Sequence, residues 1–397
     1  MTATTPRYVS GVQFASEAVR KDAYEVMARL VEHYRATSTD MVDAQWREPV
    51  ANYRDPELWQ REAQAVHRTV PLPLALSCEL PEAGSYKAVD AVGTPVIITR
   101  QRDGSLRAVV NACRHRGGEL VPEGTGTARR FTCPYHAWSY DLGGCLTGVY
   151  GEETFGPVDK LAMGLLALPV DERAGIVFVS LDRSATLDLD AWLGEDLLPL
   201  LEGLGLAGCY HHSTRTLDGP NWKVVVDGYL EGYHFASLHR TTVFRTNLSN
   251  MAAFDSWGPH QRNAFALRPI ADAVDTPRES WDPTTTVGAI YWLFPGLAIA
   301  GGWREQVAVS LVLPGSSWDT SRTEQHILLR SEPADDEERK AADHTRDWFH
   351  DVVLDEDYGA GFGVQRGLEA MAEQDFVFGR NEPGVQHFHR AIGERLD

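Results

Sequence analysis

The sequence Asp227-Gly-Tyr-Leu-Glu231-Gly-Tyr-His234-Phe-Ala-Ser-Leu-His239 organises the second half of the chain, because it places two imidazoles and the carboxylate of Glu231 close together on an apolar background. Asn221 is a suitable N-cap for a helix that enters this stretch. On an ideal helix Glu231 and His234 share one face, whereas His234 and His239 do not. If both histidines bind one metal, the helix must end, kink or bulge between them. Without a metal, the same stretch fits a buried helix whose histidines satisfy backbone groups.

A second pattern lies upstream, in the loops Asn111-Ala-Cys113-Arg-His115-Arg-Gly-Gly118 and Phe131-Thr-Cys133-Pro-Tyr-His136-Ala-Trp138. Each loop offers one thiolate and one imidazole. Two cysteines on one iron and two histidines on the other hold a two-iron, two-sulfide cluster. Zinc accepts the same four ligands. The glycines at 117 and 118 would let backbone N–H groups approach the sulfides, and Trp138 would shield them, so the surroundings favour the cluster.

Composition and charge limit the classes of function. The chain has 397 residues, 43% of them hydrophobic and 23% charged, which fits a globular protein of two or three domains. A formal net charge of −19 argues against binding to nucleic acid or to anionic membranes. Without a long apolar run or a signal-peptide pattern, we expect a cytoplasmic protein that does not enter a membrane. Five cysteines are too few for a disulfide scaffold, so we expect free or metal-bound thiols.

The pattern of apolar and turn-forming residues changes twice along the sequence, which predicts an α+β protein of three parts. Residues 1–70 carry helical apolar spacing and are expected to form a helical segment that packs on the larger domain. Residues 71–181 hold short β-rich runs separated by turn signals such as Asp103-Gly104, which predict a small antiparallel β domain. Residues 182–397 combine the candidate metal helix, several extended runs and a long helix from Pro333 past Asp357. A sheet with helices collected at its edges makes this larger domain α+β.

Taken together, the two motifs resemble those of one family. The spacing Cys113-x-His115, seventeen residues, then Cys133-x-x-His136 is similar to that of Rieske cluster domains. Asn221-Trp-Lys223, followed by Glu231-x-x-His234-x-x-x-x-His239, resembles the catalytic helix of the Rieske non-haem iron oxygenases. The similarity is to the catalytic (alpha) subunit of the aromatic-ring-hydroxylating and quaternary-amine monooxygenase superfamily, and it runs from about residue 45 to Gly379-Arg-Asn-Glu-Pro383. It implies a larger domain of the helix-grip, START-like type.

The resemblance implies two metal centres. A Rieske [2Fe-2S] cluster would be held by Cys113, His115, Cys133 and His136, and a mononuclear Fe(II) by His234, His239 and Asp357. Two histidines and one carboxylate that leave open positions suit ferrous iron and dioxygen. Helical phase from Phe349 and Val353 favours Asp357 as the third ligand and directs Glu356 elsewhere. Asp355 stays the alternative ligand.

Glu231 is the implied catalytic residue outside the ligand set. In the family, the residue at this position hydrogen-bonds an iron ligand and bridges to a cluster histidine of the neighbouring subunit. Many members have aspartate there, whereas quaternary-amine monooxygenases resemble this chain in having glutamate. The longer side chain keeps the charge and changes the reach.

The resemblance also implies a mechanism and partners. The protein would be a terminal oxygenase that takes O2 and electrons from an NAD(P)H-dependent reductase, with or without a ferredoxin. It would work as a homotrimer in which the cluster of one subunit serves the iron of the next. The substrate would be a small quaternary amine or aromatic compound, hydroxylated or oxidatively dealkylated. The sequence leaves open whether the enzyme is a monooxygenase or a dioxygenase and whether a small beta subunit is present.

An aromatic cage for a cationic substrate has four candidate residues, which also fit core packing: Tyr229, Tyr233, Trp292 and Trp303.

Two other classes of function compete with the oxygenase. One is a Rieske electron-transfer protein whose larger domain binds a ligand without catalysis. The other is a zinc-stabilised binding module. The residues His234, His239 and Asp357 discriminate between these classes, because neither an electron carrier nor a zinc module needs a second, open iron site.

Overall fold

The computed structural model describes residue 14 and residues 16–396; residues 1–13, 15 and 397, which include the start of the predicted N-terminal segment, lie outside the described part. The chain divides into two compact units. The small unit consists of Gln64–Trp192 and Leu206–Gly208, and the large unit contains the described residues up to Ala63, Leu193–Gly205 and the chain from Cys209 onward. Among the described helices, none combines the length and the apolar character needed to cross a membrane. The division at residues 70 and 181 stays a prediction.

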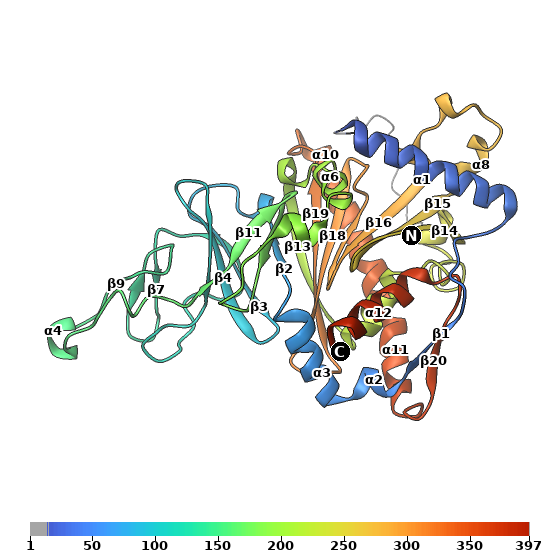
Figure 1. Ribbon diagram of the computed structural model, residues 1–397. Helices are drawn as coiled ribbons and strands as arrows, with labels where there is room; N and C mark the ends of the chain where they lie inside the picture. The colour runs from blue at the N-terminus through green and yellow to red at the C-terminus, as the bar shows by residue number, and fades with distance from the viewer. Residues whose placement is uncertain (1–13, 15, 397) are drawn as a thin grey trace. The chain divides into compact units, whose positions relative to one another are not determined.

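The small unit is built from short strands, all paired antiparallel (Figure 1). Its strands are β2 (Leu72–Leu76), β3 (Ser85–Ala91), β4 (Thr94–Arg100), β5 (Leu106–Val110), β6 (Gly124–Thr127), β7 (Phe131–Thr132), β8 (Ser139–Tyr140), β9 (Leu146–Gly148), β10 (Ala167–Leu168), β11 (Val170–Arg173) and β12 (Ile176–Val179). They form sheets in the orders β10-β5-β4-β3-β6, β11-β12-β2 and β7-β8-β9. Its short helices are α4 (Glu152–Phe155) and α5 (Leu189–Leu193). The prediction of a small antiparallel β fold is confirmed.

Turn chemistry accounts for the hairpin between β4 and β5. Gly104 adopts a positive φ of 84°, a conformation that glycine takes without a Cβ clash. The Asp103 carboxylate accepts a hydrogen bond from the backbone N–H of Ser105 at 3.0 Å. The predicted Asp103-Gly104 turn is therefore present and aligns the two strands.

The large unit contains the following helices and strands: α1 (Glu17–Ala36), β1 (Trp46–Pro49), α2 (Ala51–Arg54), α3 (Pro56–Glu62), α6 (Leu197–Glu202), β13 (Tyr210–Gly219), α7 (Trp222–Tyr229), β14 (Asn247–Trp257), β15 (His260–Leu267), α8 (Ile270–Ala273), α9 (Pro283–Thr286), β16 (Val287–Leu293), β17 (Leu297–Ala300), β18 (Gln306–Pro314), β19 (Ser321–Leu329), α10 (Asp336–Asp351), the π-helix η6 (Val352–Tyr358), α11 (Gly359–Leu368), β20 (Asp375–Phe378) and α12 (Pro383–Leu396). A seven-stranded antiparallel sheet runs in the order β13-β19-β18-β17-β16-β15-β14. Helices pack on both of its faces, which confirms the α+β class.

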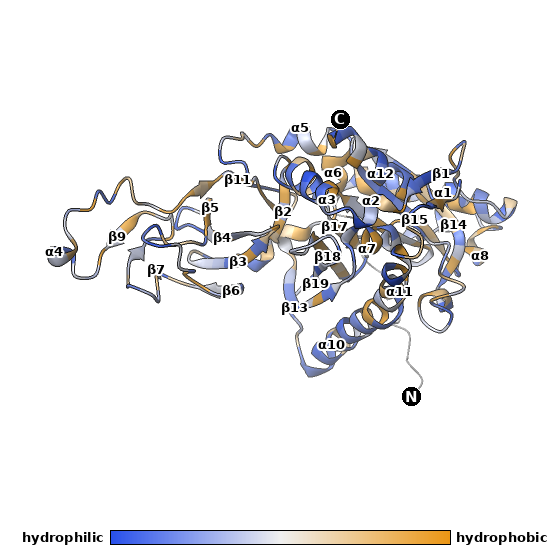
Figure 2. Ribbon diagram, turned by 90° about the horizontal axis from the view of Figure 1, so that it is seen from below, coloured by the Kyte–Doolittle hydropathy of each residue, from blue (hydrophilic) through white to orange (hydrophobic). Residues whose placement is uncertain are grey.

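The two faces of this sheet differ in what covers them. Helix α1 packs on β14 and β15 (Figure 1), whereas α7 packs on β18 and β19. Because side chains alternate along a strand, neighbouring residues of β15 point to opposite faces, and Arg262 shares the α1 face with Asp255 and Tyr291. The α7 face carries Gln325, Ser310 and Trp292. Helix α10 packs against β13 and β19 and is largely hydrophilic on its outer side (Figure 2).

A buried guanidinium joins α1 to the sheet. The side chain of Arg262 is 2% exposed and donates to the carboxylates of Asp22 on α1 and Asp255 on β14. Its guanidinium carbon lies 5.4 Å from the ring centroid of Trp257 and 5.3 Å from that of Tyr291, and Trp303 is 6.0 Å away. The cation is therefore neutralised by two acids and surrounded by aromatic rings.

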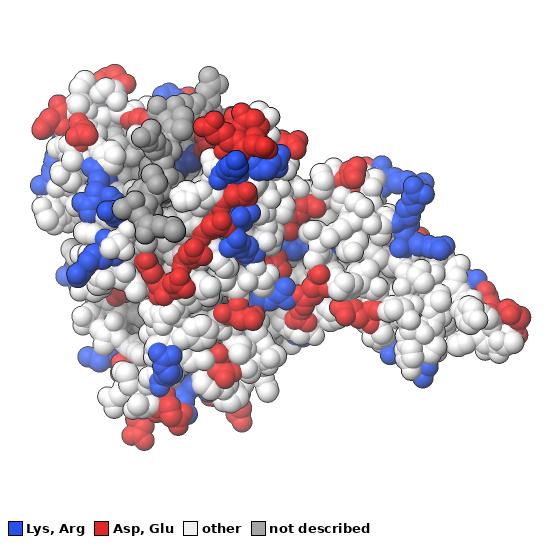
Figure 3. Space-filling model, turned by 180° about the vertical axis from the view of Figure 1, so that it is seen from behind, with Lys and Arg blue, Asp and Glu red and all other residues white. Residues whose placement is uncertain are grey.

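The face of the protein seen in Figure 3 carries both signs of charge. Figure 3 shows acidic and basic side chains interspersed on the face that it views. A nucleic-acid backbone instead selects a continuous basic surface.

Candidate metal centres

The two cluster loops share one backbone design. In the first loop the N–H of Gly117 donates to the carbonyl of Cys113, and in the second the N–H of Ala137 donates to the carbonyl of Cys133. Gly117 and Ala137 both have positive φ values, 73° and 55°. Each loop therefore reverses four residues after its cysteine, and the alanine adopts a conformation that a Cβ disfavours by about 1 kcal/mol.

The loops place both thiols in the interior of the small unit and both imidazoles nearer its surface. Cys113 and Cys133 are 4% and 2% exposed, and the hydroxyl of Tyr140 lies 3.3 Å from the Cys113 sulfur. They belong to a core with Phe131, Trp138, Tyr140 and Leu146, among others. A Cβ added at Gly118 would come within 3.3 Å of the Cys133 sulfur, so this position favours glycine.

The imidazoles face each other across the end of the two loops. The ring centroids of His115 and His136 are 4.6 Å apart, and the ring of His115 stacks on Trp138 at 5.1 Å. The Nδ1 atom of His115 is buried without a hydrogen-bond partner in the described part of the chain, which fits a metal ligand. Burial, followed by the nearby charge of Arg116, lowers the pKa of His136. A neutral imidazole is the form that binds a metal.

The spread of these four ligands distinguishes a cluster from a zinc ion. Two groups of three candidate ligand atoms within 4.8 Å of one another occur among the described residues. Neither group includes a cysteine or a histidine of these loops. A tetrahedral zinc site brings four such atoms around one ion, whereas a two-iron cluster holds cysteine and histidine pairs on separate irons. The donor set fits the cluster.

The second candidate centre begins where α7 ends. Asn221 caps the helix as predicted, because its side chain accepts from the N–H groups of Lys223 and Val224. The helix stops at Tyr229, and Leu230 is its C-cap. The placement of Glu231 and His234 on one helical face is therefore wrong, since both follow the helix end. The helix is expected to end, kink or bulge between His234 and His239, but it stops before both of them.

Three ligand atoms converge after that end. The Nε2 atoms of His234 and His239 lie 3.1 Å apart. The Asp357 carboxylate oxygen Oδ1 lies 3.0 Å from Nε2 of His239 and 3.6 Å from Nε2 of His234. These residues form a group whose ligand atoms all lie within 4.8 Å of one another. Two neutral imidazole nitrogens and a carboxylate are the donor set of a two-histidine, one-carboxylate iron site.

The outer nitrogens of both imidazoles are held by acids. The Nδ1 atom of His234 contacts a carboxylate oxygen of Glu231, and Nδ1 of His239 lies 2.5 Å from Oε2 of Glu356. The hydroxyl of Thr242 also donates to Oε2 of Glu356 at 2.7 Å. A carboxylate on the outer nitrogen fixes the tautomer that presents Nε2 to a metal. Burial disfavours the charged form of His239, but Asp357 and then Glu356 outweigh it and raise its pKa.

A π-helix sets which acids of the sequence 355–357 face the histidines. The predicted long helix from Pro333 past Asp357 is present as an unbroken helical run, but its middle is the π-helix η6 (Val352–Tyr358) between α10 and α11 rather than α-helix. The wider π turn changes the phase of the side chains. Asp357 and Glu356 both reach the histidines, whereas Asp355 is exposed. The expected outward direction of Glu356 is therefore wrong, and its role in holding His239 had no signal beyond the acidic run.

A buried acid–base network surrounds Asp227, four residues before Glu231 in the sequence. The hydroxyl of Tyr53 donates to Asp227 at 2.5 Å and lies 3.1 Å from Nε2 of His389, which is 2.9 Å from the other oxygen of Asp227. The Nδ1 atom of His389 lies 3.7 Å from Glu48. Burial disfavours the imidazolium, but the two carboxylates raise the pKa of His389 to about 9. Burial also works against the Glu48 carboxylate, yet its interaction with His389 lowers its pKa to about 2. No sequence signal links these residues, because they come from three distant segments.

The four candidate residues of the aromatic cage lie in different parts of the large unit. Only two of its members lie together, since the rings of Tyr229 and Trp292 are 6.1 Å apart. Trp303 lies beside Arg262 on the α1 face, and Tyr233 is 63% exposed. The four aromatic residues therefore do not form one cage.

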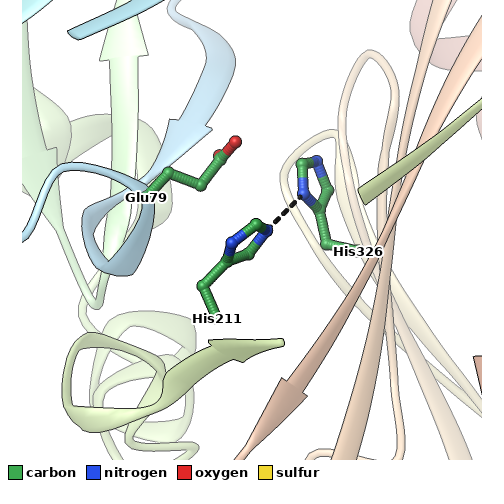
Figure 4. A group of neighbouring side chains, drawn as sticks. All are labelled: Glu79, His211 and His326. Atoms are coloured by element: carbon green, nitrogen blue, oxygen red, sulfur yellow. Dashed lines mark hydrogen bonds between the residues drawn. The ribbon is translucent and has the colours of Figure 1, made fainter. Parts of the chain in front are cut away.

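Another histidine pair lies on the sheet, away from the α7 face. Nε2 of His211 on β13 is 3.4 Å from Nδ1 of His326 on β19 (Figure 4). The hydroxyl of Thr214 lies 2.9 Å from each of these nitrogens. This hydrogen-bonded triplet ties the edge strand β13 to β19.

The fold and the two donor sets define an iron–sulfur protein with a separate site for a single non-haem iron. The comparisons agree. A family model described as a Rieske [2Fe-2S] domain matches residues 70–155, and one described as the catalytic domain of the ring hydroxylating alpha subunit matches residues 206–397. The chain belongs to the Rieske oxygenase alpha subunits, with a Rieske [2Fe-2S] domain and a ring-hydroxylating catalytic domain whose triad is consistent with mononuclear iron.

Individual relatives agree with this family. The carnitine monooxygenase oxygenase subunit of Escherichia coli (strain K12) is 28% identical over 366 residues, which cover 88% of this chain and 93% of that protein. The anthranilate 1,2-dioxygenase large subunit of Acinetobacter baylyi is 34% identical over 198 residues, covering 47% of this chain and 41% of that protein. The prediction of a Rieske-type mono- or dioxygenase is confirmed at this level, against an electron carrier or a zinc module.

Solved structures share the fold. The quaternary ammonium Rieske monooxygenase CntA, in complex with L-carnitine, has a TM-score of 0.75 at 22% identity and covers 94% of this chain and 99% of its own. Naphthalene 1,2-dioxygenase from Rhodococcus sp., bound to indole, has a TM-score of 0.73 at 18% identity and covers 96% of this chain and 99% of its own.

Proposed function

We propose that this terminal oxygenase holds its two centres with the seven residues that the motifs single out. The cluster ligands are Cys113, His115, Cys133 and His136, and the iron ligands are His234, His239 and Asp357. The observation that carries the second assignment is the convergence of three ligand atoms, two of which belong to imidazoles whose outer nitrogens are held by acids. A carboxylate on the outer nitrogen of each imidazole leaves the inner nitrogen, Nε2, to act as a metal ligand.

Iron bound at such a site supplies the activation of dioxygen. The surrounding residues orient the iron ligands. Glu231 and Glu356 fix the two imidazoles by their Nδ1 atoms, and Thr242 holds the Glu356 carboxylate in place. Burial, with a contribution from the charge of Asp357, raises the pKa of the Tyr229 phenol to about 12, so this phenol stays protonated at neutral pH.

Glu231 is proposed to connect neighbouring subunits. One of its oxygens contacts His234, and the other accepts from the backbone N–H groups of Tyr233 and His234. The exposure of Tyr233 supports a position near the protein surface. A homotrimer would then bring a cluster histidine of another copy to Glu231, as in the family pattern.

The substrate and electron supply follow from the relatives. The chain covers nearly the whole of a carnitine monooxygenase oxygenase subunit, and half of it is similar to an aromatic dioxygenase large subunit. We propose a small quaternary amine or aromatic substrate and electrons from NAD(P)H through a reductase, with or without a ferredoxin. We further propose a cytoplasmic location and domains at 1–70, 71–181 and 182–397.

Two measurements test this proposal. Metal and sulfide analysis of anaerobically purified protein should give the two irons and two sulfides of the cluster plus one further iron. Oxygen and NADH consumption with a reconstituted reductase should rise when a betaine or an aromatic compound from a panel is added. Zinc in place of the cluster, or a chain with the cluster irons alone, would contradict the ligand assignment.

Glu231→Gln provides a separate test of the bridge. The variant should keep both metal centres and lose electron transfer between them, so that the reduced cluster persists when substrate and O2 are present. Normal turnover would contradict the bridging role. Glu373→Gln, the same change at an exposed glutamate of the same unit, is the matched control and should leave turnover unchanged.

A further inference from the structure

A bulge interrupts β14 beside residues 230–233, the loop that carries Glu231 (the Glu231 loop). Residues 248–251 of β14 have only Ala266 of β15 opposite them, because the register of the two strands shifts there. Asn250 in this bulge has a positive φ of 56°, a left-handed conformation that few residues other than glycine and asparagine adopt. Bulges are common next to active sites, where they redirect parts of the chain.

The bulge holds the backbone of the Glu231 loop. The N–H of Asn250 donates to the carbonyl of Gly232 at 3.1 Å. The hydroxyl of Ser249 lies 3.1 Å from the carbonyl oxygens of both Gly232 and Tyr233. These two carbonyls follow Glu231 directly in the chain. The bulge therefore fixes the main chain next to the Glu231 carboxylate.

Asn381 connects the bulge to residues 379–383, the segment that the sequence pattern near the end of the chain singled out. Its side-chain amide donates to the side-chain oxygen of Asn250 at 2.8 Å. The segment forms a closed turn, since the N–H of Glu382 donates to the carbonyl of Gly379 at 3.2 Å. The side chain of Gln386 on α12 donates to the same carbonyl at 2.9 Å. Asn381 thus ties the bulge to a turn that is itself held by α12.

The chain around this turn also contacts the Glu231 loop directly. A Cβ added at Gly384 would lie 2.6 Å from the carbonyl oxygen of Leu230, so only glycine allows this close approach. Burial, with a further contribution from the negative charge of Glu231, raises the pKa of Glu382. The two glutamates are therefore close enough for their charges to interact.

We propose that Asn381 and Asn250 are positioning residues for Glu231, because the hydrogen bond between them fixes the Glu231 loop in the conformation needed for electron transfer between neighbouring subunits. This role rests on the proposed function, since it assumes that Glu231 forms the bridge. The loop follows the end of α7 and has no helical hydrogen bonds of its own to hold it. An error of about 1 Å in the position of a reacting group can cost a hundredfold in rate, so such a loop needs outside support.

Two variants remove this hydrogen bond from its opposite ends. Asn381→Leu keeps the volume of the side chain and loses the donor. Asn250→Gly loses the acceptor but keeps the positive φ and the backbone N–H that donates to Gly232. Either variant should keep its full content of iron and sulfide.

Two readouts follow the loop in these variants. In a single turnover with O2 and the betaine or aromatic compound that most stimulates O2 consumption, the reduced cluster should be reoxidised about tenfold more slowly than in the unmodified protein. Amide hydrogen exchange of residues 228–236, measured by mass spectrometry without substrate, should become about fivefold faster, as expected for the loss of one hydrogen bond. Unchanged exchange or unchanged reoxidation in both variants would overturn the proposal.

The double variant tests whether the two residues act together. Because both changes remove the same hydrogen bond, Asn381→Leu combined with Asn250→Gly should be reoxidised no more slowly than the slower single variant. Slowing by the product of the two single effects would show that the residues act separately and would contradict the proposal.

Thr39→Val is the matched control. The hydroxyl of Thr39 accepts from the N–H of Ala252 at 3.0 Å, at the point where β14 returns to register with β15. This variant also loses a hydrogen bond at the bulge, but it should keep normal reoxidation and normal exchange of residues 228–236. Thermal unfolding compares the stability of all variants. Equal slowing in Thr39→Val would show that the stability of the bulge, and not the position of the loop, controls the rate.

Glu231→Gln separates this proposal from the proposed function. Slow reoxidation in Glu231→Gln together with normal reoxidation in Asn381→Leu would overturn the positioning role and leave the bridge standing. Normal reoxidation in Glu231→Gln would contradict the bridge itself, and the positioning role with it.

Discussion

In the cluster loops each cysteine lies four residues before a left-handed residue that turns the chain back, and each loop supplies one thiol and one imidazole. The mononuclear site is assembled differently. Two of its candidate ligands follow α7, and the third comes from a π-helix more than a hundred residues later. The first centre depends on local backbone geometry, whereas the second depends on how distant segments pack. Substitutions should therefore act locally in the first and at a distance in the second.

The largest effect is expected from Asp357→Ala. Loss of the carboxylate should remove the mononuclear iron and reduce substrate-stimulated O2 consumption by about a hundredfold or more, while the cluster irons remain. Iron analysis and the visible spectrum of the cluster measure the two centres separately. The exposed neighbour provides the control, since Asp355→Ala should retain all irons and full activity. A reversed result would assign the third ligand to Asp355.

The next effect concerns the buried network of His389. Its pKa in the folded protein, about 9, is above its ordinary value of 6.5, so the stability it contributes is fully present below pH 6.5 and is lost as the pH rises through about 9. The loss should amount to roughly 3 kcal/mol at most. Urea unfolding at pH 6.5 and 9.5 measures it.

The comparison variant for this prediction is His389→Phe, which keeps an aromatic ring beside Phe378 and Phe388. Its unfolding free energy should be lower at pH 6.5 and should fall less on going to pH 9.5. An equal alkaline loss in both proteins would show that other groups cause it. If His389→Phe does not fold, Glu48→Gln should still move the alkaline loss to lower pH, because it removes one of the acids that raise the pKa.

A smaller effect is expected from Glu356→Gln. The amide keeps the size of the side chain but replaces the charged partner of His239, so the affinity for Fe(II) should fall about tenfold. Competition with a chelator under anaerobic conditions measures this. Asp355→Asn, one residue earlier in the same π-helix, is the control and should have no effect. Unchanged affinity in Glu356→Gln would indicate that Asp357 alone orients the imidazole.

The smallest effect belongs to the cluster loops. Ala137→Gly should stabilise the protein by up to about 1 kcal/mol, because it removes the Cβ from a residue with φ of 55°. Gly117→Ala should have the opposite effect of similar size, since nothing lies within 4 Å of the added Cβ and only the backbone is strained. Chemical unfolding of the cluster-loaded protein measures both. Effects of the same sign would contradict the shared design of the loops.

The contrast between the centres also explains what could be predicted from the sequence. The cluster motif, the Asp103-Gly104 hairpin and the Asn221 cap depend on residues within a few positions of one another, and all could be read directly. The direction of Glu356 could not, because α-helical phase was assumed where the chain forms a π-helix. The contacts of Asp227 with Tyr53 and His389 also had no signal, since only tertiary packing brings those segments together.

The seven-stranded sheet separates two chemically opposite environments by the thickness of one backbone. Arg262, with its acids and rings, occupies one side of β15, while Gln261 and Asn263 occupy the other. Because strand side chains alternate, deleting a single residue from β15 would exchange these sides and turn a guanidinium toward the iron ligands. The alignment of β15 with its neighbours is thus a condition for activity, and a change in the length of this strand should cost more than a substitution within it.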